Sequence, residues 1–416
     1  MKRIISIQII ILSFVSIVSC ERIEPEYPEY HVSDPVPLSL TRTQQEYLEK
    51  GDTLAFNLLD LIAQKADGKD FFFSPLSVQM ALSMLLNGTD GEAFDELCNV
   101  LGYGEDLPSV NDFCKQIIER TPTWYPNVRL SFANAMVGNN KYSFKAPYVN
   151  TLKNIFSAEV KNMDFSKPNE VLKYINNWSN KKTYGMIPKI LDHIDSKTAF
   201  ALMNALYFEG SWSSPFNKAD TKKESFHCEN GKTVKVFMMN QHFDHTYCFV
   251  GANWKSFSLN YKNSAFKMRI FLPDENTSVQ TLINQIKAYG YSRFIQSSAS
   301  VNVNLDLKLP RFEANYSEDD FAKHIYDLGA HSLFKGGSLS KISDSANGSL
   351  SVIHKARIKV DEEGSVAAAT TAVTYITSPG VYEQHIDFFC DRPFLYIIED
   401  NHSGLILFIG KYGGNN

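Results

Sequence analysis

The 416-residue sequence lacks the motifs on which most hydrolases and nucleotide-binding proteins depend. It contains no G-x-S-x-G, H-E-x-x-H or P-loop spacing. Its 41 basic residues are balanced by 46 acidic ones and form no stripe, which argues against nucleic acid as a partner. An enzyme, for instance a secreted hydrolase, therefore remains an alternative that no motif supports.

Cysteine is scarce, and its spacing excludes the common metal and redox sites. None of the six cysteines belongs to a CxxC pair or to a Cys/His cluster of the kind that binds zinc. The sequence thus predicts no cofactor and no metal site. If Cys20 is set aside, an odd number remains, so at least one thiol must be unpaired. These five are Cys98, Cys114, Cys228, Cys248 and Cys390.

Long apolar runs are also absent, except at the N-terminus. Two basic residues precede an apolar stretch at 4–18, which is too short for a comfortable membrane span and is typical of a signal peptide, predicted over residues 1–19. Residues 17–20 resemble a bacterial lipobox, which implies acylation of Cys20 after cleavage. The alternative is an ordinary secretory signal in which Cys20 is incidental. Both interpretations take the protein out of the cytoplasm.

Residues 20–40 cannot pack a core, because residues 21–37 hold four prolines and five acidic residues. This composition predicts an acidic, Pro-rich, semi-rigid tether. With Cys20 it predicts a lipid-anchored protein of the bacterial cell envelope, facing the outer membrane or the cell surface. Periplasmic and surface orientations both stay open. Residues 41–416 are predicted to form one large folded domain, and we expect a monomer.

Local patterns predict both helices and strands, and hence an α+β fold. Apolar spacing predicts an amphipathic helix over 52–64. Ser74 as a cap and Pro75 at the first helical position predict a buried helix over 78–86. A nearly continuous apolar run predicts a central strand over 199–212. That run contains Asn204, whose amide needs partners, because burying it unpaired costs about 1–3 kcal/mol.

The stretch from 360 to 394 has the most unusual composition in the chain. Gly364 has no Cβ and can act as a pivot. No proline and no charge lie between Gly364 and Thr377. These small and β-branched residues suit a strand buried on both faces, whereas their alanines favour a helix. Composition alone therefore also fits an Ala/Thr-rich surface loop or a frayed helix.

Several segments resemble those of one family in the same order along the chain. Residues 362–370 are similar to the hinge of the serpins, residues 204–212 to a strand signature, and residues 391–394 to a C-terminal one. The matches run from Phe72 to Lys411. The resemblance implies the serpin fold, with a large central, mostly antiparallel sheet, two further sheets, surrounding helices and an exposed C-terminal reactive loop at about 362–390.

The resemblance also implies roles for individual residues. A cluster that governs opening of the central sheet matches Ser74, Ser77, Asn204 and His354, with Trp212 at the point where the loop enters. Taken without the resemblance, His354 would be an ordinary strand histidine. The implied hinge comprises Glu362, Glu363, Gly364, Ser365, Val366, Ala367, Ala368, Ala369 and Thr370.

The resemblance places the reactive bond about fourteen residues past the hinge glycine, after Ser378. Because Pro379 follows and resists most serine proteases, we predict Thr377–Ser378 instead. Threonine suggests elastase-like targets, and tyrosine would suggest chymotrypsin-like ones. The alternative positions are Tyr375, Ile376, Pro379, Tyr382 and Glu383.

The function implied is that of a protease inhibitor outside the cytoplasm. A serine protease, or a papain-like cysteine protease, would attack the loop and form an acyl-enzyme. Insertion of the cleaved loop into the central sheet would then distort the trapped protease. Two departures from the family pattern are Val366, where inhibitory hinges often carry an acid, and a slightly long loop. The alternative is a noninhibitory serpin that acts as a surface binding protein.

Overall fold

The computed structural model describes residues 38–66, 68–120, 128–262, 264–318, 321–345, 350–365 and 384–414. The chain divides into units 1–30 and 31–416, and every element below belongs to the second. The predicted signal peptide, Cys20 and the tether up to residue 37 lie outside the described residues. Leu38 and Leu40, at the end of the predicted tether, already pack against the core. Among the described helices, none is both long and apolar enough to cross a bilayer.

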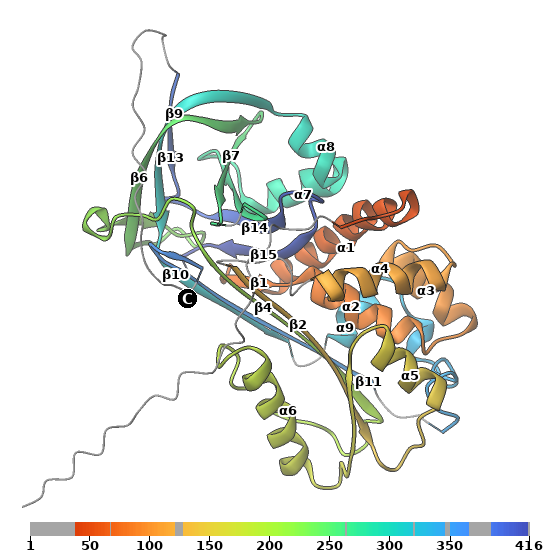
Figure 1. The fold of residues 1–416 in the computed structure, drawn as a ribbon. Coiled ribbons are helices and arrows are strands. Elements are labelled where there is room, and N and C mark those ends of the chain that lie inside the picture. Colours follow the sequence, from red (N-terminus) through yellow and green to blue (C-terminus); the bar gives the residue numbers. More distant parts are fainter. Residues whose placement is uncertain are drawn as a thin grey trace, which may run out of the picture. The chain divides into compact units, whose positions relative to one another are not determined.

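The central sheet has six strands, in the order β10-β11-β4-β2-β3, with β12 beside β4 (Figure 1). Three of its five pairings are antiparallel, and β11–β4 and β2–β3 are parallel, so the sheet is mostly antiparallel. Its strands are β2 (Val128–Asn139), β3 (Glu159–Met163), β4 (Phe200–Ser211), β10 (Phe312–Glu318), β11 (Leu350–Val360) and β12 (Gly364–Ser365).

The remaining strands form one nine-stranded sheet, in which the two further expected sheets are joined. The join is made by β6, whose 18 residues pair first with β5 and then with β9 and β7. The order is β1-β15-β14-β8-β7-β6-β9-β13, with β5 beside β6. The strands are β1 (Phe71–Phe73), β5 (Lys222–His227), β6 (Thr233–Val250), β7 (Trp254–Asn260), β8 (Phe266–Pro273), β9 (Ala299–Pro310), β13 (His385–Phe389), β14 (Phe394–Asp400) and β15 (Ile406–Tyr412).

The helices confirm the α+β class. The first helix begins ten residues before the predicted position 52, because its first turns bury only Gln44 and Tyr47 and so show little apolar periodicity. The helix predicted over 78–86 begins at Pro75, with Ser74 as its cap. The helices are α1 (Arg42–Ala66), α2 (Pro75–Leu86), α3 (Gly91–Leu101), α4 (Leu107–Arg120), α5 (Ala146–Asn154), α6 (Pro168–Lys182), α7 (Val279–Tyr289), α8 (Tyr291–Gln296) and α9 (Ala322–Asp327).

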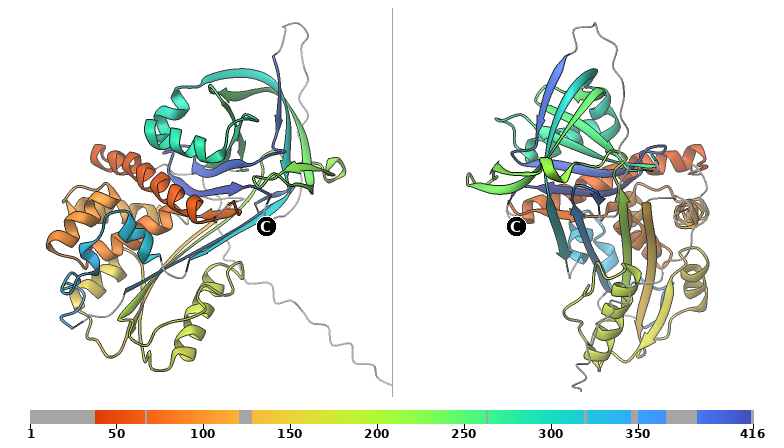
Figure 2. Two further views of the ribbon diagram at one scale, coloured as in Figure 1. Left: turned by 180° about the vertical axis from the view of Figure 1, so that it is seen from behind. Right: turned by 60° about the vertical axis from the view of Figure 1, so that its left-hand side comes forward.

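Helices cover β4 on both faces, as its apolar sequence predicted. Leu202 and Leu206 belong to the core cluster that includes α2, whereas Ala201 and Met203 belong to the cluster formed with α6. Figure 2 shows α6 on one side of the central sheet and α2 on the other. Burial of apolar side chains on both faces makes β4 the central element of the sheet.

Candidate functional site

The central sheet is paired incompletely between β4 and β11. Their parallel ladder joins only four residue pairs, from Phe200 with Leu350 to Met203 with Ile353. Both strands continue well beyond that point, to Ser211 and Val360 respectively, and no further pairing joins them in the part of the chain that the structure describes. Buried strand backbone needs hydrogen-bond partners, so this region of the sheet can accept another strand.

The hinge begins at the far end of that region. β12 pairs antiparallel with β4, with Gly364 opposite Ser211 and Ser365 opposite Gly210. A Cβ on Gly364, at φ 156°, would lie 2.1 Å from the carbonyl oxygen of Gly210 and 2.7 Å from the Cα of Ser211. The sequence predicted a pivot here. The structure shows a close approach of two backbones, for which glycine is required.

Two aromatic side chains support the buried side of the hinge. The Ser365 hydroxyl is fully buried and lies 2.8 Å from the hydroxyl of Tyr261. Trp212 stacks on Tyr261 with ring centroids 4.7 Å apart, and its Nε1 donates to the Asp361 carbonyl at 3.0 Å. The backbone N–H of Trp212 also donates to the Glu363 carbonyl at 2.9 Å. Trp212 therefore contacts the hinge itself and does not belong to the polar cluster around Asn204.

The first hinge glutamate is buried in an ion pair. Its carboxylate, 2 % exposed, accepts hydrogen bonds from Arg311 Nη2 and from Thr221 Oγ1, the latter at 2.6 Å. Burial opposes ionisation, but these two bonds hold the pKa of Glu362 below its ordinary value. The next residue, Glu363, pairs with Lys218 near the surface. Arg311, Thr221 and Lys218 were missed from the sequence, because they lie far from the hinge along the chain.

The structure brings Ser74, Ser77, Asn204 and His354 together. The Ser74 backbone N–H donates to His354 Nε2 at 3.2 Å, and the Ser77 hydroxyl donates to Asn204 Oδ1. The Ser74 hydroxyl donates to the Leu407 carbonyl at 2.7 Å. Burial lowers the pKa of His354 to about 3, so its imidazole is neutral near pH 7 and accepts through Nε2.

Asn134 also belongs to this cluster, although the sequence did not predict it. Asn204 Nδ2 donates to Asn134 Oδ1 at 2.6 Å, and Asn134 Nδ2 donates to the Phe156 carbonyl at 2.7 Å. Asn134 lies on β2 directly opposite Asn204 in the ladder. Asn134 could have been identified from the sequence by the same signal as Asn204, namely an asparagine within an apolar strand. The hydrogen-bond partners that the buried Asn204 amide was predicted to need are thus supplied by Ser77 of α2 and Asn134 of β2.

The polar cluster lies where the central ladder ends. Met203 and Ile353 are the last paired residues of β4 and β11, and Asn204 and His354 follow them directly. The hydrogen bonds from Ser77 and Ser74 therefore attach each strand to the N-terminus of α2 at the point of separation. Such a network can hold the two strands in place while they are apart and must adjust if a strand enters between them.

The rest of the predicted loop site lies outside the described residues. This applies to the predicted reactive bond Thr377–Ser378 and to all its alternatives. It also applies to the second part of the hinge, Val366, Ala367, Ala368, Ala369 and Thr370. All five cysteines of the described residues are buried free thiols.

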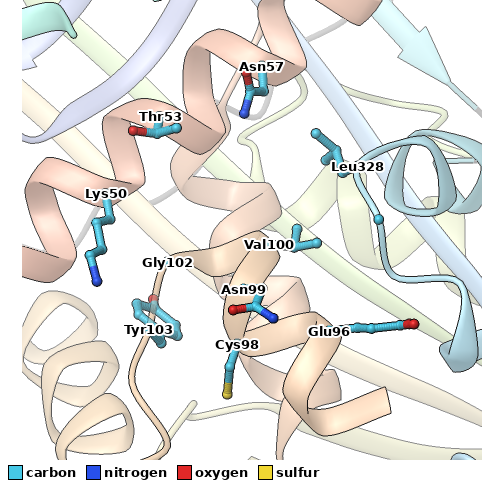
Figure 3. Close-up of a pocket in the computed structure, with 11 residues that line it drawn as sticks. Lys50, Thr53, Asn57, Glu96, Cys98, Asn99, Val100, Gly102, Tyr103 and Leu328 are labelled. Atoms are coloured by element: carbon cyan, nitrogen blue, oxygen red, sulfur yellow. The ribbon is translucent and has the colours of Figure 1, made fainter. Parts of the chain in front are cut away.

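A surface pocket of about 440 Å³ lies among α1, α3 and the segment after α9 (Figure 3). It includes Lys50 of α1 and Glu96 of α3. No residue of the hinge or of the polar cluster lines it. We therefore assign the candidate site to the hinge and the central sheet and not to this pocket. The other lining residues are Thr53, Asn57, Cys98, Asn99, Val100, Gly102, Tyr103, Leu328 and Gly329.

The fold and the site together define an α+β protein whose central sheet carries a short hinge strand at the end of an incomplete ladder. Residues 49–413 match the family model described as serpin (serine protease inhibitor). The chain therefore belongs to the serpin family. Its members are mostly protease inhibitors rather than enzymes.

Individual relatives resemble the chain over most of its length. Serpin-Z10 of Arabidopsis thaliana is 34% identical over 372 residues, which cover 84% of this chain and 93% of the relative. The leukocyte elastase inhibitor of Equus caballus is 29% identical over 382 residues, covering 88% and 99%. The thermophilic serpin tengpin, solved in its native state, superposes with a TM-score of 0.78 at 27% identity and covers 92% of this chain and 96% of its own.

Proposed function

We propose that this protein is an inhibitory serpin that traps serine proteases as covalent acyl-enzymes. The observation that carries the proposal is the short β4–β11 ladder, which joins four residue pairs although both strands run on. The hinge strand β12 already pairs with β4 at the open end of this region. The absence of proline and charge between Gly364 and Thr377 further supports insertion of this segment as a strand.

The proposed reaction begins with attack of the protease serine on the carbonyl carbon of Thr377. An ester forms, the Thr377–Ser378 peptide bond breaks, and the chain from Ser378 leaves with a new amino terminus. The freed segment then continues the register of β12 along β4, which places Thr371 opposite Asn204. Each added backbone hydrogen bond contributes about 1 kcal/mol net, so the driving force requires many of them together.

Trapping follows because the protease remains attached to the moving segment. A displacement of about 1 Å in an active site can slow the reaction on the order of a hundredfold, so deacylation stalls. On β4, α6 packs over Ala201 and Met203 and must accommodate the incoming strand. The buried pair of Glu362 with Arg311 keeps the start of the loop fixed during this movement.

We further propose elastase-like or chymotrypsin-like proteases as targets, with papain-like cysteine proteases as a further class. The small Thr377 and the match to a leukocyte elastase inhibitor support the first choice. Cys20 and the acidic tether support a lipid-anchored position in a bacterial cell envelope, facing outward. The protein would thus meet its targets at the membrane surface as a monomer.

The test is to mix the chain with elastase-, chymotrypsin-, trypsin-, subtilisin- and papain-like proteases and to separate the products on denaturing gels. We expect a covalent band of combined mass with at least one serine protease. Mass spectrometry of the released peptide should show Ser378 as its first residue. Complete cleavage of the loop by every protease, without a covalent band, would contradict trapping and favour the noninhibitory binding protein.

A further inference from the structure

A cluster of imidazoles and carboxylates lies on the nine-stranded sheet, apart from the hinge. Asp306 of β9 lies opposite His242 of the antiparallel strand β6 and opposite Asp387 of the parallel strand β13. His385 lies two residues before Asp387, and Asp244 lies two residues after His242. Side chains two positions apart in a strand point to the same face. The partly exposed faces of three neighbouring strands therefore bring five ligand-type side chains together.

Three of these side chains have the spacing of metal ligands. His385 Nε2 lies 3.2 Å from Asp387 Oδ1 and 3.3 Å from Asp306 Oδ2. One ligand atom from each residue falls within 4.8 Å of the other two. Tetrahedral zinc ligands at about 2.0–2.2 Å from the ion are about 3.3–3.6 Å from one another. The two distances from His385 Nε2 are therefore close to those between zinc ligands.

A fourth side chain holds one of these ligands in place. His242 Nδ1 lies 2.6 Å from Asp306 Oδ1, whereas His385 pairs with Asp306 Oδ2, and His242 Nε2 lies 3.0 Å from Asp244 Oδ1. Such outer hydrogen bonds fix the orientation of ligating groups and raise metal affinity. His242 is thus a positioning residue for Asp306.

The chemistry of the three side chains indicates which cation would fit. The carboxylates of Asp306 and Asp387 stand opposite each other on neighbouring strands, where like charges repel. A ligand set with one imidazole nitrogen and two carboxylate oxygens favours first-row transition metals over Mg²⁺ or Ca²⁺, which prefer oxygen ligands alone. The side chains are about half exposed, so water can complete the coordination.

We propose that His385, Asp306 and Asp387 bind a divalent transition-metal ion, with zinc as the expected ion, and that His242 positions Asp306. The sequence predicted no metal site, because Asp306 and the His385–Asp387 pair lie far apart and match no metal motif. The topology alone brings them together, through the parallel pairing of β13 with β9.

Metal binding at this site would hold β13, the strand that follows the predicted loop, against the sheet. β13 is an edge strand, and its only pairing among the described residues is with β9. An ion shared by His385, Asp387 and Asp306 would add a side-chain link between these two strands. Detachment of β13 from the sheet edge should then be slower with the metal than without it.

The site is tested by isothermal titration of ZnCl₂ into the full chain carrying Cys20→Ser, which removes the one thiol outside the described residues. We expect one zinc ion per chain. His385→Gln should weaken binding at least tenfold, and His242→Gln about 10- to 100-fold. His193→Gln, which removes an exposed imidazole elsewhere, should change nothing. Equal zinc affinity in the parent and His385→Gln, or equal affinity for MgCl₂ and ZnCl₂, would overturn the proposal.

Hydrogen exchange tests the consequence for β13 without relying on protease inhibition. Zinc should slow amide exchange at residues 385–389 in the parent chain and in His193→Gln, but not in His385→Gln. If zinc binds the parent chain with no change in this exchange, the link between β13 and β9 is refuted. Because no protease takes part, these results stand whether or not the protein traps its targets.

Discussion

At the scale of single residues, the backbone around Gly364 sets the position of the hinge. Gly364→Ala would place a methyl group 2.1 Å from the Gly210 carbonyl oxygen, so β12 would have to move away from β4. We expect a loss of about 1–3 kcal/mol in unfolding free energy, measured by urea denaturation. Gly336→Ala is the matched control, since a Cβ there meets nothing within 4 Å, and a loss as large in that variant would contradict the explanation.

Ser365 tests the requirement for a small residue at the start of the inserting strand. Its side chain is fully buried against Tyr261, and an arginine there could enter the sheet only by burying its charge. Ser365→Arg should convert the inhibitor into a substrate, raising the amount of protein consumed per trapped protease at least tenfold. Ser365→Ala should preserve trapping. Undiminished inhibition by the arginine variant would count against loop insertion.

Glu362 should make stability depend on pH. The pKa of Glu362 is lower in the folded chain than in the unfolded chain, because Arg311 and Thr221 hydrogen-bond its carboxylate. The ionised carboxylate therefore adds stability above the unfolded pKa, about 4.3, and that stability is lost as pH falls through the folded value. The difference in melting temperature between the parent and Glu362→Gln should shrink on acidification.

The pH dependence is measured by thermal unfolding between pH 7 and pH 3. Glu119→Gln, which removes an exposed partner of Lys115, serves as the control and should leave the melting temperature unchanged throughout. A constant difference between the parent and Glu362→Gln across this range would show that the buried ion pair does not account for the stability.

At the scale of elements, the polar cluster joins β4, β11, β2 and α2 where the central ladder ends. Asn204→Ala would remove the amide that links Ser77 to Asn134 and leave both groups buried without that partner. We expect a loss of about 1–3 kcal/mol in unfolding free energy by urea denaturation. Asn150→Ala, at an exposed position on α5, should be nearly neutral. Equal effects of the two substitutions would contradict a role for the cluster.

Elements with strong apolar patterns could be predicted, and those that depend on distant partners could not. The apolar run at 199–212 predicted both ends of β4 to within one residue, and Ser74 and Pro75 indicated where α2 begins. The first half of α1 was missed, because it is polar. The long strand β6 could not be predicted as one element, because its later residues carry mixed exposure and a register shift near Phe243.

The family resemblance placed Ser74, Ser77, Asn204 and His354 in one cluster, and the rest of the candidate site was predictable only where the chain is locally distinctive. Gly364 and Ser365 stand out by composition, whereas Arg311 and Tyr261 contact the hinge only through the fold. Trp212, which the family resemblance places where the loop enters the sheet, donates its backbone N–H to the Glu363 carbonyl of the hinge.

At the scale of the whole molecule, loop insertion requires a central sheet that has room for one more strand between β4 and β11. Hydrogen exchange followed by mass spectrometry, before and after loop cleavage, tests this most directly. In the intact chain, amides 204–209 of β4 and 354–358 of β11 should exchange faster than amides 200–203, which lie in the paired ladder. After cleavage, both regions should become as protected as the ladder. Unchanged exchange on cleavage, in a chain shown by mass to be cut within the loop, would contradict insertion.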